Sequence, residues 1–233
     1  MVRLNDSERM LLQRVMAAGA IDDVQVKKIA KKLTGEELTK EDVDDMINKI
    51  AESVRPFALD VRRGVYDDGK VYIGICNTSN DALTQFGSHF KPWEIVLLRK
   101  AIEEIVERLG SDEGALHESD LVNLRDNQSV TEVAELLRKL TNEKWLAMSM
   151  YDAGQLTLGP RTYLELIAFL RDLEIKKCSI CQYEMLQGVP CKGRTGASSS
   201  NACGTLIHES CLERYEERGL KYKCTTCKQV VRR

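Results

Sequence analysis

Eight residues that bind soft metal ions are crowded into the last quarter of this chain. Zinc prefers thiolate sulfur and imidazole nitrogen, four to a tetrahedral site, so eight ligands predict two sites. Because four protein ligands leave no open coordination position, both zinc ions are expected to be structural. The candidate ligands are Cys178, Cys181, Cys191, Cys203, His208, Cys211, Cys224 and Cys227.

The spacing of these residues favours metal over disulfides. Cys178–Cys181 and Cys224–Cys227 are C-x-x-C pairs, each on a short turn that can aim two sulfurs at one ion. His208 and Cys211 are three apart, so one helical turn can present both. The N-terminal segment "MVRLNDSERMLLQRV" lacks a signal-peptide core, and a reducing compartment favours metal binding.

Pairing of the ligands is left open by spacing alone, because neighbouring or alternate pairs can share an ion. The ligand order resembles the cross-brace of RING and PHD modules, in which alternate pairs share one. That resemblance implies two ligand sets. Site one is Cys178, Cys181, His208 and Cys211, and site two is Cys191, Cys203, Cys224 and Cys227.

RING and PHD modules predict different functions, and the histidine in fifth place occurs in both PHD modules and variant RINGs. PHD modules usually place the third and fourth ligands a few residues apart, whereas Cys191 and Cys203 are far apart here. Tyr222, two residues before Cys224, is similar to an aromatic of PHD modules. The alternative, which we favour, is that Tyr222 packs around the metal.

A RING has no catalytic side chain and works by positioning a ubiquitin-charged conjugating enzyme. The resemblance implies that Ile180, Leu212, Tyr215 and Lys228 face that enzyme. Thr225 stands where many RINGs carry proline, and Lys228 stands where they carry arginine. Lysine keeps the charge but lacks the planar guanidinium, so we expect a weak ligase when the chain acts alone.

The bulk properties indicate a globular protein of one or two domains with a small metal module added. The chain has 233 residues, a net charge of -2, 43% hydrophobic and 30% charged residues. No apolar run approaches the roughly 18 residues of a membrane span, so no membrane contact is expected. Cys76, alone in "VYIGICN", is predicted to be a buried apolar residue of a strand.

The elements before the metal module repeat one order. Helical periodicity predicts three helices over 7–20, 23–35 and 39–55, with Asp6 or Ser7 and then Thr39 as caps. A hairpin follows, turning at Asp67-Asp68-Gly69. Three helices and a two-stranded wing are typical of a winged helix.

The second half repeats this order with different residues. Helices are predicted from Pro92, over 117–125 and from Ser129 or Thr131, then a hairpin turning at 152–154 and one helix over 161–174. The predicted fold class is α+β, with tandem winged helices and a cross-braced two-zinc variant RING. The expected domains are residues 1–88, 89–174 and 175–233.

Charges on the winged helices favour protein docking over DNA reading. In the first winged helix, the third helix is the one that would enter the DNA major groove. It carries Glu41, Asp42, Asp44 and Asp45, which would repel the phosphates. The second helix carries Lys27, Lys28, Lys31 and Lys32. This basic cluster is either a solvated face or a weak phosphate contact.

The whole arrangement resembles the non-SMC element one family of the Smc five/six complex. The segments that carry the resemblance are "KCSICQYEMLQGVPC", "NACGTLIHESC" and "YKCTTC", placed after tandem winged helices. It implies a variant-RING ubiquitin ligase in the nucleus, bound to chromosomes and acting in DNA repair by homologous recombination.

The resemblance also implies partners. The winged helices would dock the MAGE-family element three, which boosts activity and links the chain to the kleisin-like element four and the Smc five/six core. Two alternatives to the ligase function stay open. One is a non-enzymatic scaffold stabilised by the zinc module, and the other is a histone or DNA reader.

Overall fold

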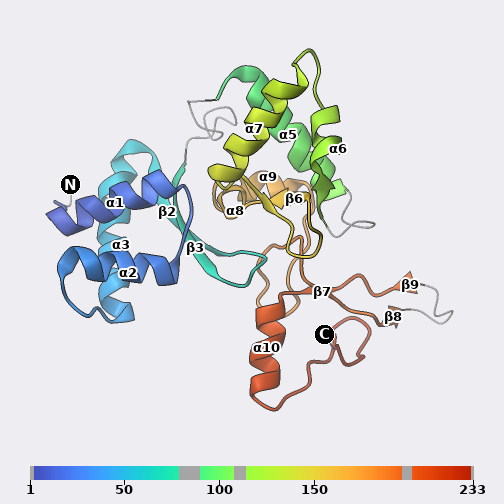
Figure 1. The fold of residues 1–233 in the computed structure, drawn as a ribbon. Coiled ribbons are helices and arrows are strands. Elements are labelled where there is room, and N and C mark those ends of the chain that lie inside the picture. Colours follow the sequence, from blue (N-terminus) through green and yellow to red (C-terminus); the bar gives the residue numbers. More distant parts are fainter. Residues whose placement is uncertain (1–2, 79–89, 108–113, 196–200, 232–233) are drawn as a thin grey trace.

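The computed structural model describes residues 3–78, 90–107, 114–195 and 201–231. Helices and strands are mixed, and the described residues form three large hydrophobic cores and a small one of Ala20, Cys76 and Leu164 (Figure 1). None of the helices within these ranges is both long and apolar enough to span a membrane. The predicted α+β class with tandem winged helices and a cross-braced C-terminal module is confirmed.

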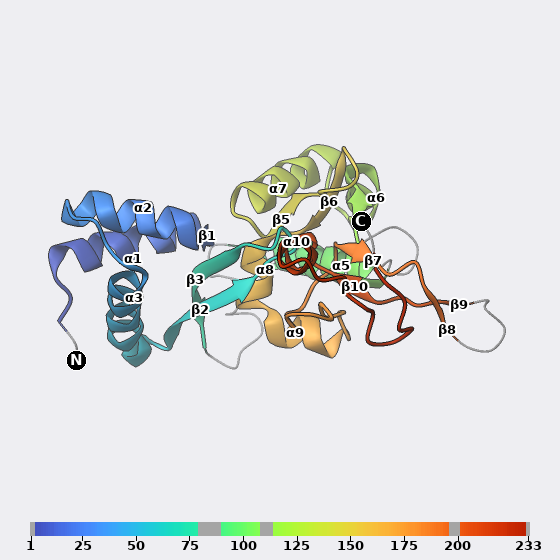
Figure 2. The same ribbon diagram turned by 90° about the horizontal axis from the view of Figure 1, so that it is seen from below.

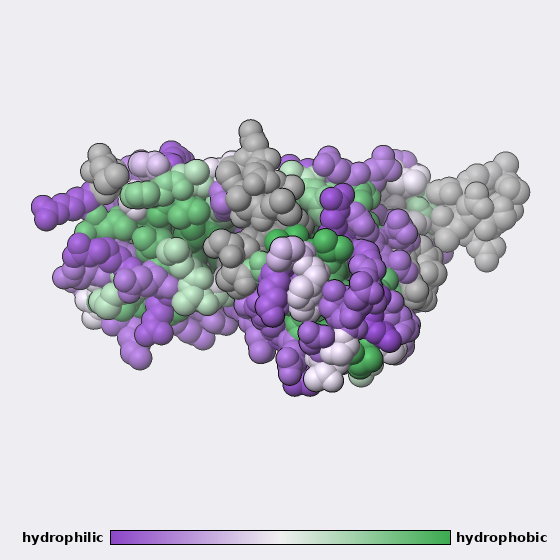
Figure 3. Space-filling model, turned by 90° about the horizontal axis from the view of Figure 1, so that it is seen from above, coloured by the Kyte–Doolittle hydropathy of each residue, from purple (hydrophilic) through white to green (hydrophobic). Residues whose placement is uncertain are grey.

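The first winged helix packs three helices against a three-stranded antiparallel sheet of order β1-β3-β2. Its elements are α1 (Asp6–Ala18), β1 (Ile21–Asp22), α2 (Asp23–Thr34), α3 (Lys40–Val54), the 3-10 turn η1 (Arg55–Phe57), β2 (Leu59–Val65) and β3 (Val71–Asn77). Leu11, Ile50 and Ile73 are almost fully buried in its core. Figure 3 shows apolar surface gathered over this domain, which also exposes Met10, Met16 and Phe57.

Helix caps explain where two of these helices begin. Thr39 caps α3 as predicted, accepting a hydrogen bond from the Asp42 amide. The prediction of Asp6 or Ser7 for α1 is wrong, because Asn5 is the cap and forms a capping box with Glu8. The Ser7 hydroxyl instead donates to the Leu33 carbonyl at the end of α2.

The second winged helix repeats the arrangement with a sheet of order β4-β6-β5. Its elements are α5 (Pro92–Glu107), β4 (Leu116–His117), α6 (Glu118–Asn123), α7 (Val130–Asn142), β5 (Leu146–Met148), β6 (Gln155–Leu158), α8 (Pro160–Glu165) and α9 (Ile167–Asp172). Ser129 caps α7 in a capping box with Glu132. The two-residue strands β1 and β4, which complete the two sheets, were not predicted. The expected boundary between residues 88 and 89 lies outside the described residues.

The single helix predicted over 161–174 is wrong, because the chain leaves helical geometry at Leu166, where φ is -108°. Breaking a helix frees carbonyl groups, which need new donors. The Arg62 guanidinium donates to the Leu164 and Glu165 carbonyls at 3.0 and 3.4 Å, and the Cys76 thiol also donates to Leu164. The first winged helix thus caps α8 from outside.

Cys76 is fully buried as predicted, and burial raises its pKa to about 12.

The C-terminal module has little regular structure. Its elements are β7 (Val189–Pro190), β8 (Arg194–Thr195), β9 (Asn201–Ala202), β10 (Leu206–Ile207) and α10 (Glu209–Glu217). Its core is small, and four of its nine buried residues are cysteines, packed with apolar side chains such as Met185 and Ile207. A core of this size supplies little hydrophobic stabilisation, so the module needs additional cross-links.

The tip of the β2–β3 hairpin, residues 66–70, lies between the second winged helix and the C-terminal module (Figure 2). The Tyr66 hydroxyl donates to the Leu158 carbonyl at 2.8 Å. The buried Asp67 carboxylate accepts hydrogen bonds from the Tyr163 hydroxyl at 2.9 Å and the Leu186 amide at 3.0 Å. One carboxylate therefore joins all three parts of the chain.

The hairpin tip fits closely against its neighbours. Gly69 has φ 74°, and a Cβ atom there would overlap the Ser210 hydroxyl in α10. Burial raises the pKa of Asp67 to about 6, although the hydrogen bonds from Leu186 and Tyr163 oppose that rise. Since this pKa lies below 7, Asp67 is largely ionised at neutral pH and accepts both bonds.

We expect Asp67→Ala to lower the free energy of unfolding by about 2–4 kcal/mol, because it leaves the buried Tyr163 hydroxyl and Leu186 amide without an acceptor. Urea unfolding of the metal-loaded chain measures this loss. Asp152→Ala, at the exposed tip of the other hairpin, is the matched control and should change stability by less than about 0.5 kcal/mol. Equal losses in the two variants would contradict the joint assigned to Asp67.

Candidate metal centres

Two clusters of metal-binding side chains form in the C-terminal module. Within each cluster the four ligand atoms lie within 4.8 Å of one another. One cluster is Cys178, Cys181, His208 and Cys211, and the other is Cys191, Cys203, Cys224 and Cys227. The alternate pairing implied by the cross-brace resemblance is therefore the pairing in the structure.

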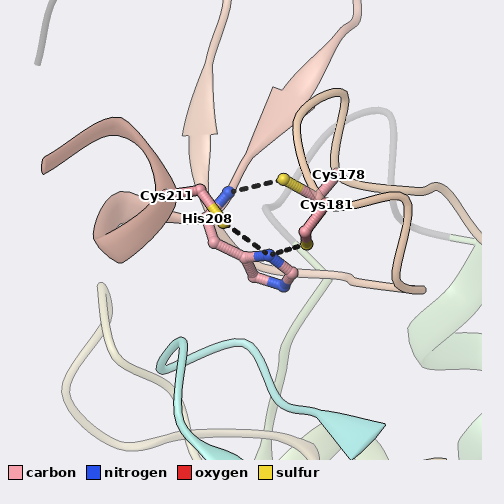
Figure 4. Close-up of side chains that lie close together, drawn as sticks. All are labelled: Cys178, Cys181, His208 and Cys211. Atoms are coloured by element: carbon pink, nitrogen blue, oxygen red, sulfur yellow. Dashed lines mark hydrogen bonds between the residues drawn. The ribbon is translucent and has the colours of Figure 1, made fainter. Parts of the chain in front are cut away.

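Site one is built from a turn and the start of α10 (Figure 4). The Nδ1 atom of His208 lies 3.3 Å from the Cys181 sulfur and 3.9 Å from the Cys211 sulfur. In a tetrahedral site with Zn–S bonds of about 2.3 Å and Zn–N bonds of about 2.0–2.1 Å, the nitrogen lies about 3.5 Å from each sulfur, so these distances fit a bound ion. Because Nδ1 faces the sulfurs, binding requires the neutral tautomer that carries its proton on Nε2.

Site two consists of four cysteines. The sulfurs of Cys191 and Cys227 are 3.4 Å apart, and those of Cys203 and Cys224 are 3.5 Å apart. A Cβ atom at Gly193 would collide with the Cys227 sulfur, so only glycine leaves room for this ligand. Four sulfurs at this spacing match a tetrahedral thiolate site.

The electrostatics of site one favour a positive charge at its centre. Hydrogen bonds from Cys181 and Cys211 hold the pKa of Cys178 below its ordinary value, while hydrogen bonds to Cys178 and Cys181 raise that of Cys211. Burial disfavours the charged form of His208. The neighbouring sulfurs outweigh this and raise its pKa to about 9. Crowded thiolates of this kind need a cation, and a divalent metal ion supplies the charge.

The two C-x-x-C turns are the same structure repeated 46 residues apart, from Cys178 to Cys224. In both turns the first cysteine amide donates to the carbonyl five residues later, at 2.9 Å. The residue after the second cysteine has positive φ in each, 64° at Gln182 and 62° at Lys228. We call these turns the first and second knuckles, residues 176–185 and 222–231. Each ligand pair is therefore positioned by backbone hydrogen bonds.

Three of the residues expected to face a conjugating enzyme are accessible. Ile180 and Tyr215 are half-buried, and Lys228 is exposed with its ammonium group donating to the Thr225 carbonyl at 2.7 Å. The expectation for Leu212 is wrong, because its side chain is fully buried in the core of the module. It directly follows the ligand Cys211, and α10 turns both residues inward.

Tyr222 connects the surface features of the module. It is buried, which supports the expectation of packing around the metal and removes it from a peptide-binding surface. Its hydroxyl donates to the Ser179 hydroxyl at 3.0 Å, and its ring meets the Tyr215 ring edge-on at 5.3 Å. Tyr222 thus holds the first knuckle beside α10, so the neighbourhoods of Ile180 and Tyr215 adjoin.

Two contacts to the sulfurs were not predicted. The Arg214 guanidinium donates to the Cys211 sulfur at 3.5 Å, and the Thr205 hydroxyl lies 3.2 Å from the Cys203 sulfur. Such groups orient ligands and tune their charge. The only sequence signal was their position within three residues of a candidate ligand.

The basic cluster of Lys27, Lys28, Lys31 and Lys32 is exposed on α2, where Lys31 pairs with Glu37.

Comparisons with known proteins agree with this architecture. Residues 8–126, just over half of the chain, match the family model "Nse1 non-SMC component of SMC5-6 complex". The non-structural maintenance of chromosomes element 1 homolog of Bos taurus is 27% identical over 236 residues, covering 96% of this chain and 83% of the relative. Element 1 of Schizosaccharomyces pombe is 25% identical, covering 90% and 87%.

A solved structure extends the similarity to the complete fold. One chain of the solved "Nse1-Nse3-Nse4 complex" superposes with a TM-score of 0.76 at 24% identity, over 100% of this chain and 99% of that one. Since the family model covers more than half of the residues, this chain belongs to the family of the Nse1 non-SMC component of the SMC5-6 complex.

Proposed function

We propose that the chain binds two structural zinc ions and acts as a RING-type ubiquitin-protein transferase subunit. Cys178, Cys181, His208 and Cys211 would hold one ion, and the four cysteines of site two would hold the other. The ions would supply cross-links that fold the module and no reaction chemistry, because both ligand sets are complete.

The observation that carries the ligase proposal is the surface assembled around Tyr222. The first knuckle presents Ile180, and Tyr215 on α10 adjoins it through Tyr222. An apolar surface beside a metal-held turn suits the docking of a conjugating enzyme. The chain would act by orienting that enzyme and restricting its attached ubiquitin, which requires no catalytic side chain.

The second knuckle supports a weak activity. Thr225 lacks the stiffness of proline, and the Lys228 ammonium group folds back onto the Thr225 carbonyl. A lysine held by its own loop must leave that carbonyl before it can bridge two other proteins. A partner that reorders this loop would therefore raise the activity.

The partners follow from the family and from the solved complex. In that complex an Nse1 chain is assembled with Nse3 and Nse4. We extend this to the present chain: a MAGE-family Nse3 would dock on the winged helices and link it to the kleisin-like Nse4 and the SMC5-6 core. The setting would be nuclear chromosomes and DNA repair by homologous recombination. We retain 1–88, 89–174 and 175–233 as the proposed domains, with DNA contact weak at most.

A non-enzymatic scaffold is the second candidate, and the hairpin tip favours it. Asp67 and Gly69 fasten the metal module to both winged helices. A module fixed in this way would stabilise protein–protein contacts without any ubiquitin transfer. Direct measurement of ubiquitin discharge separates the two functions.

Metal analysis should find two zinc ions per chain, and loss of each site should have different consequences. Cys203→Ser removes a site-two ligand, and none of the described hydrogen bonds joins those ligands to the winged helices. His208→Ala disrupts site one at the start of α10, where Ser210 contacts the hairpin tip, and the Leu186 amide of the same module donates to Asp67 on that tip. Hydrogen exchange at the Leu186 amide should therefore rise about tenfold or more in His208→Ala and little in Cys203→Ser. Fewer than two zinc ions, or equal exchange in both variants, would contradict this.

Ile180→Ala should slow ubiquitin discharge from a charged conjugating enzyme by about tenfold, since truncating an apolar anchor typically costs about 1–2 kcal/mol or more. The assay uses the zinc-loaded chain with its MAGE partner across a panel of conjugating enzymes. Leu220→Ala, an exposed apolar residue of the same module beyond the end of α10, is the control and should leave the rate unchanged. If no enzyme discharges faster with the complex, the ligase proposal fails and the scaffold is favoured.

The double change Thr225→Pro, Lys228→Arg should increase discharge without the partner by about threefold or more. Among the described contacts the Thr225 amide donates no hydrogen bond, so proline removes none, and arginine restores the planar fork. Lys223→Arg, also exposed on the second knuckle, is the control. An unchanged rate in the double variant would show that this loop does not limit the activity.

A further inference from the structure

The outer edge of β2 carries backbone groups that are free to pair. Tyr66 donates to Lys70 at one end of the hairpin, and Thr78 donates to Ala58 at the other. These two bonds show which pairs of the ladder are hydrogen-bonded. The backbone N–H and C=O groups of the even-numbered residues of β2 therefore point toward β3, and those of the odd-numbered residues point away from it. Of the outward residues, Arg63 and Val65 have no backbone partner in the part of the chain that the structure describes. Figure 2 shows β2 on the side of the sheet away from β1.

Hollows lie on both faces of the sheet beside this edge. The larger, about 480 Å³, lies between the starts of α2 and α3 over Val71 and Ile73, which are cross-strand partners of Val65 and Arg63. The smaller, about 180 Å³, lies between β2 and the α8–α9 segment. Arg63 and Tyr183 line both hollows, so the two form one groove, which we call the junction groove. Tyr183 belongs to the first knuckle and is 44% exposed.

Positive charge predominates around this groove. Its cations are Lys27, Lys40, Arg62, Arg63 and Arg171, and its acids are Asp23, Asp44 and Glu184. Two of the acids are already neutralised, since Asp44 pairs with Arg63 at 2.6 Å and Glu184 pairs with Arg171 at 2.6 Å. Within the described residues, Lys27 and Lys40 pair with no carboxylate, and Arg62 binds only neutral carbonyls. The groove therefore has cations to spare for a negatively charged ligand.

Edge strands often carry charged side chains simply to prevent pairing, but the arginines of β2 are engaged elsewhere. Arg62 caps α8, and Arg63 reaches across to α3. Neither side chain is therefore free to block the edge. An incoming strand would find open backbone groups, with a hollow on each face for its alternating side chains.

We propose that the junction groove binds an extended acidic segment of a partner protein, which adds to β2 as a fourth strand. Carboxylates on one face of that segment would enter the larger hollow, where they would meet Lys27 and Lys40, and apolar side chains on its other face would enter the smaller hollow over Leu164 and Ile167. Tyr183 makes the metal module part of the binding surface. This site differs from the surface proposed for the conjugating enzyme, and it does not depend on ligase activity.

The test uses the full-length zinc-loaded chain and two fluorescent peptides of about eight residues, a typical strand length. One alternates valine and glutamate, and the other alternates valine and lysine. Fluorescence anisotropy should show the acidic peptide binding at least about tenfold more tightly, and its binding should slow hydrogen exchange at the Arg63 and Val65 amides. Equal affinities, or no protection of these two amides, would overturn the proposal.

Variants test the groove directly. Lys27→Glu/Lys40→Glu and Tyr183→Ala should each weaken acidic-peptide binding by about tenfold. Val65→Pro removes one outward amide and should weaken it further, and the other two variants test the site if Val65→Pro does not fold. Lys28→Glu/Lys32→Glu, with two exposed cations of the same helix, is the matched control and should stay within about twofold. An equal loss in that control, or displacement of the peptide by a DNA oligonucleotide, would show a general basic surface instead.

Discussion

The burial of one carboxylate, Asp67, determines how the parts of this molecule are joined. A buried carboxylate is tolerated only when its oxygens accept hydrogen bonds. The two oxygens of Asp67 accept from the Tyr163 hydroxyl and the Leu186 amide. Those partners belong to the second winged helix and to the metal module. The hairpin must therefore reach between them, and the position of the metal module depends on a turn far upstream in the chain.

The metal module has a different constraint, which is the scarcity of apolar side chains. Its two knuckles repeat one hydrogen-bond pattern and present four sulfurs at a common spacing. Because each cluster takes ligands from distant segments, a metal ion in either one would cross-link the module. Tyr222 then ties the first knuckle to α10, which places the proposed enzyme-facing residues together. The fold of the module and its proposed function thus share the same contacts.

The winged helices carry the surfaces proposed for partner docking. The acidic third helix of the first domain and the edge of β2 are both suited to protein contacts. In the junction groove, the starts of α2 and α3, the strand edge and Tyr183 of the metal module contribute to one surface. Binding there would be sensitive to the metal, because Tyr183 lies on the knuckle that carries two of the ligands. Ligand binding, module folding and domain arrangement would then be linked.

Local patterns in the sequence were sufficient for most of the elements and for the metal ligands. Helical periodicity, caps such as Thr39 and the Asp-Asp-Gly turn act over a few residues, and a C-x-x-C pair positions its sulfurs through its own backbone. Contacts between distant segments decided the rest. The helix predicted after Pro160 breaks at Leu166, and Arg62 and Cys76 on distant β strands supply donors to the carbonyls beside the break. Leu212 turns inward because α10 packs on the core of the module. The joint at Asp67 and the groove beside β2 exist only once the domains meet, since hydrogen bonds and burial between distant residues leave no local pattern.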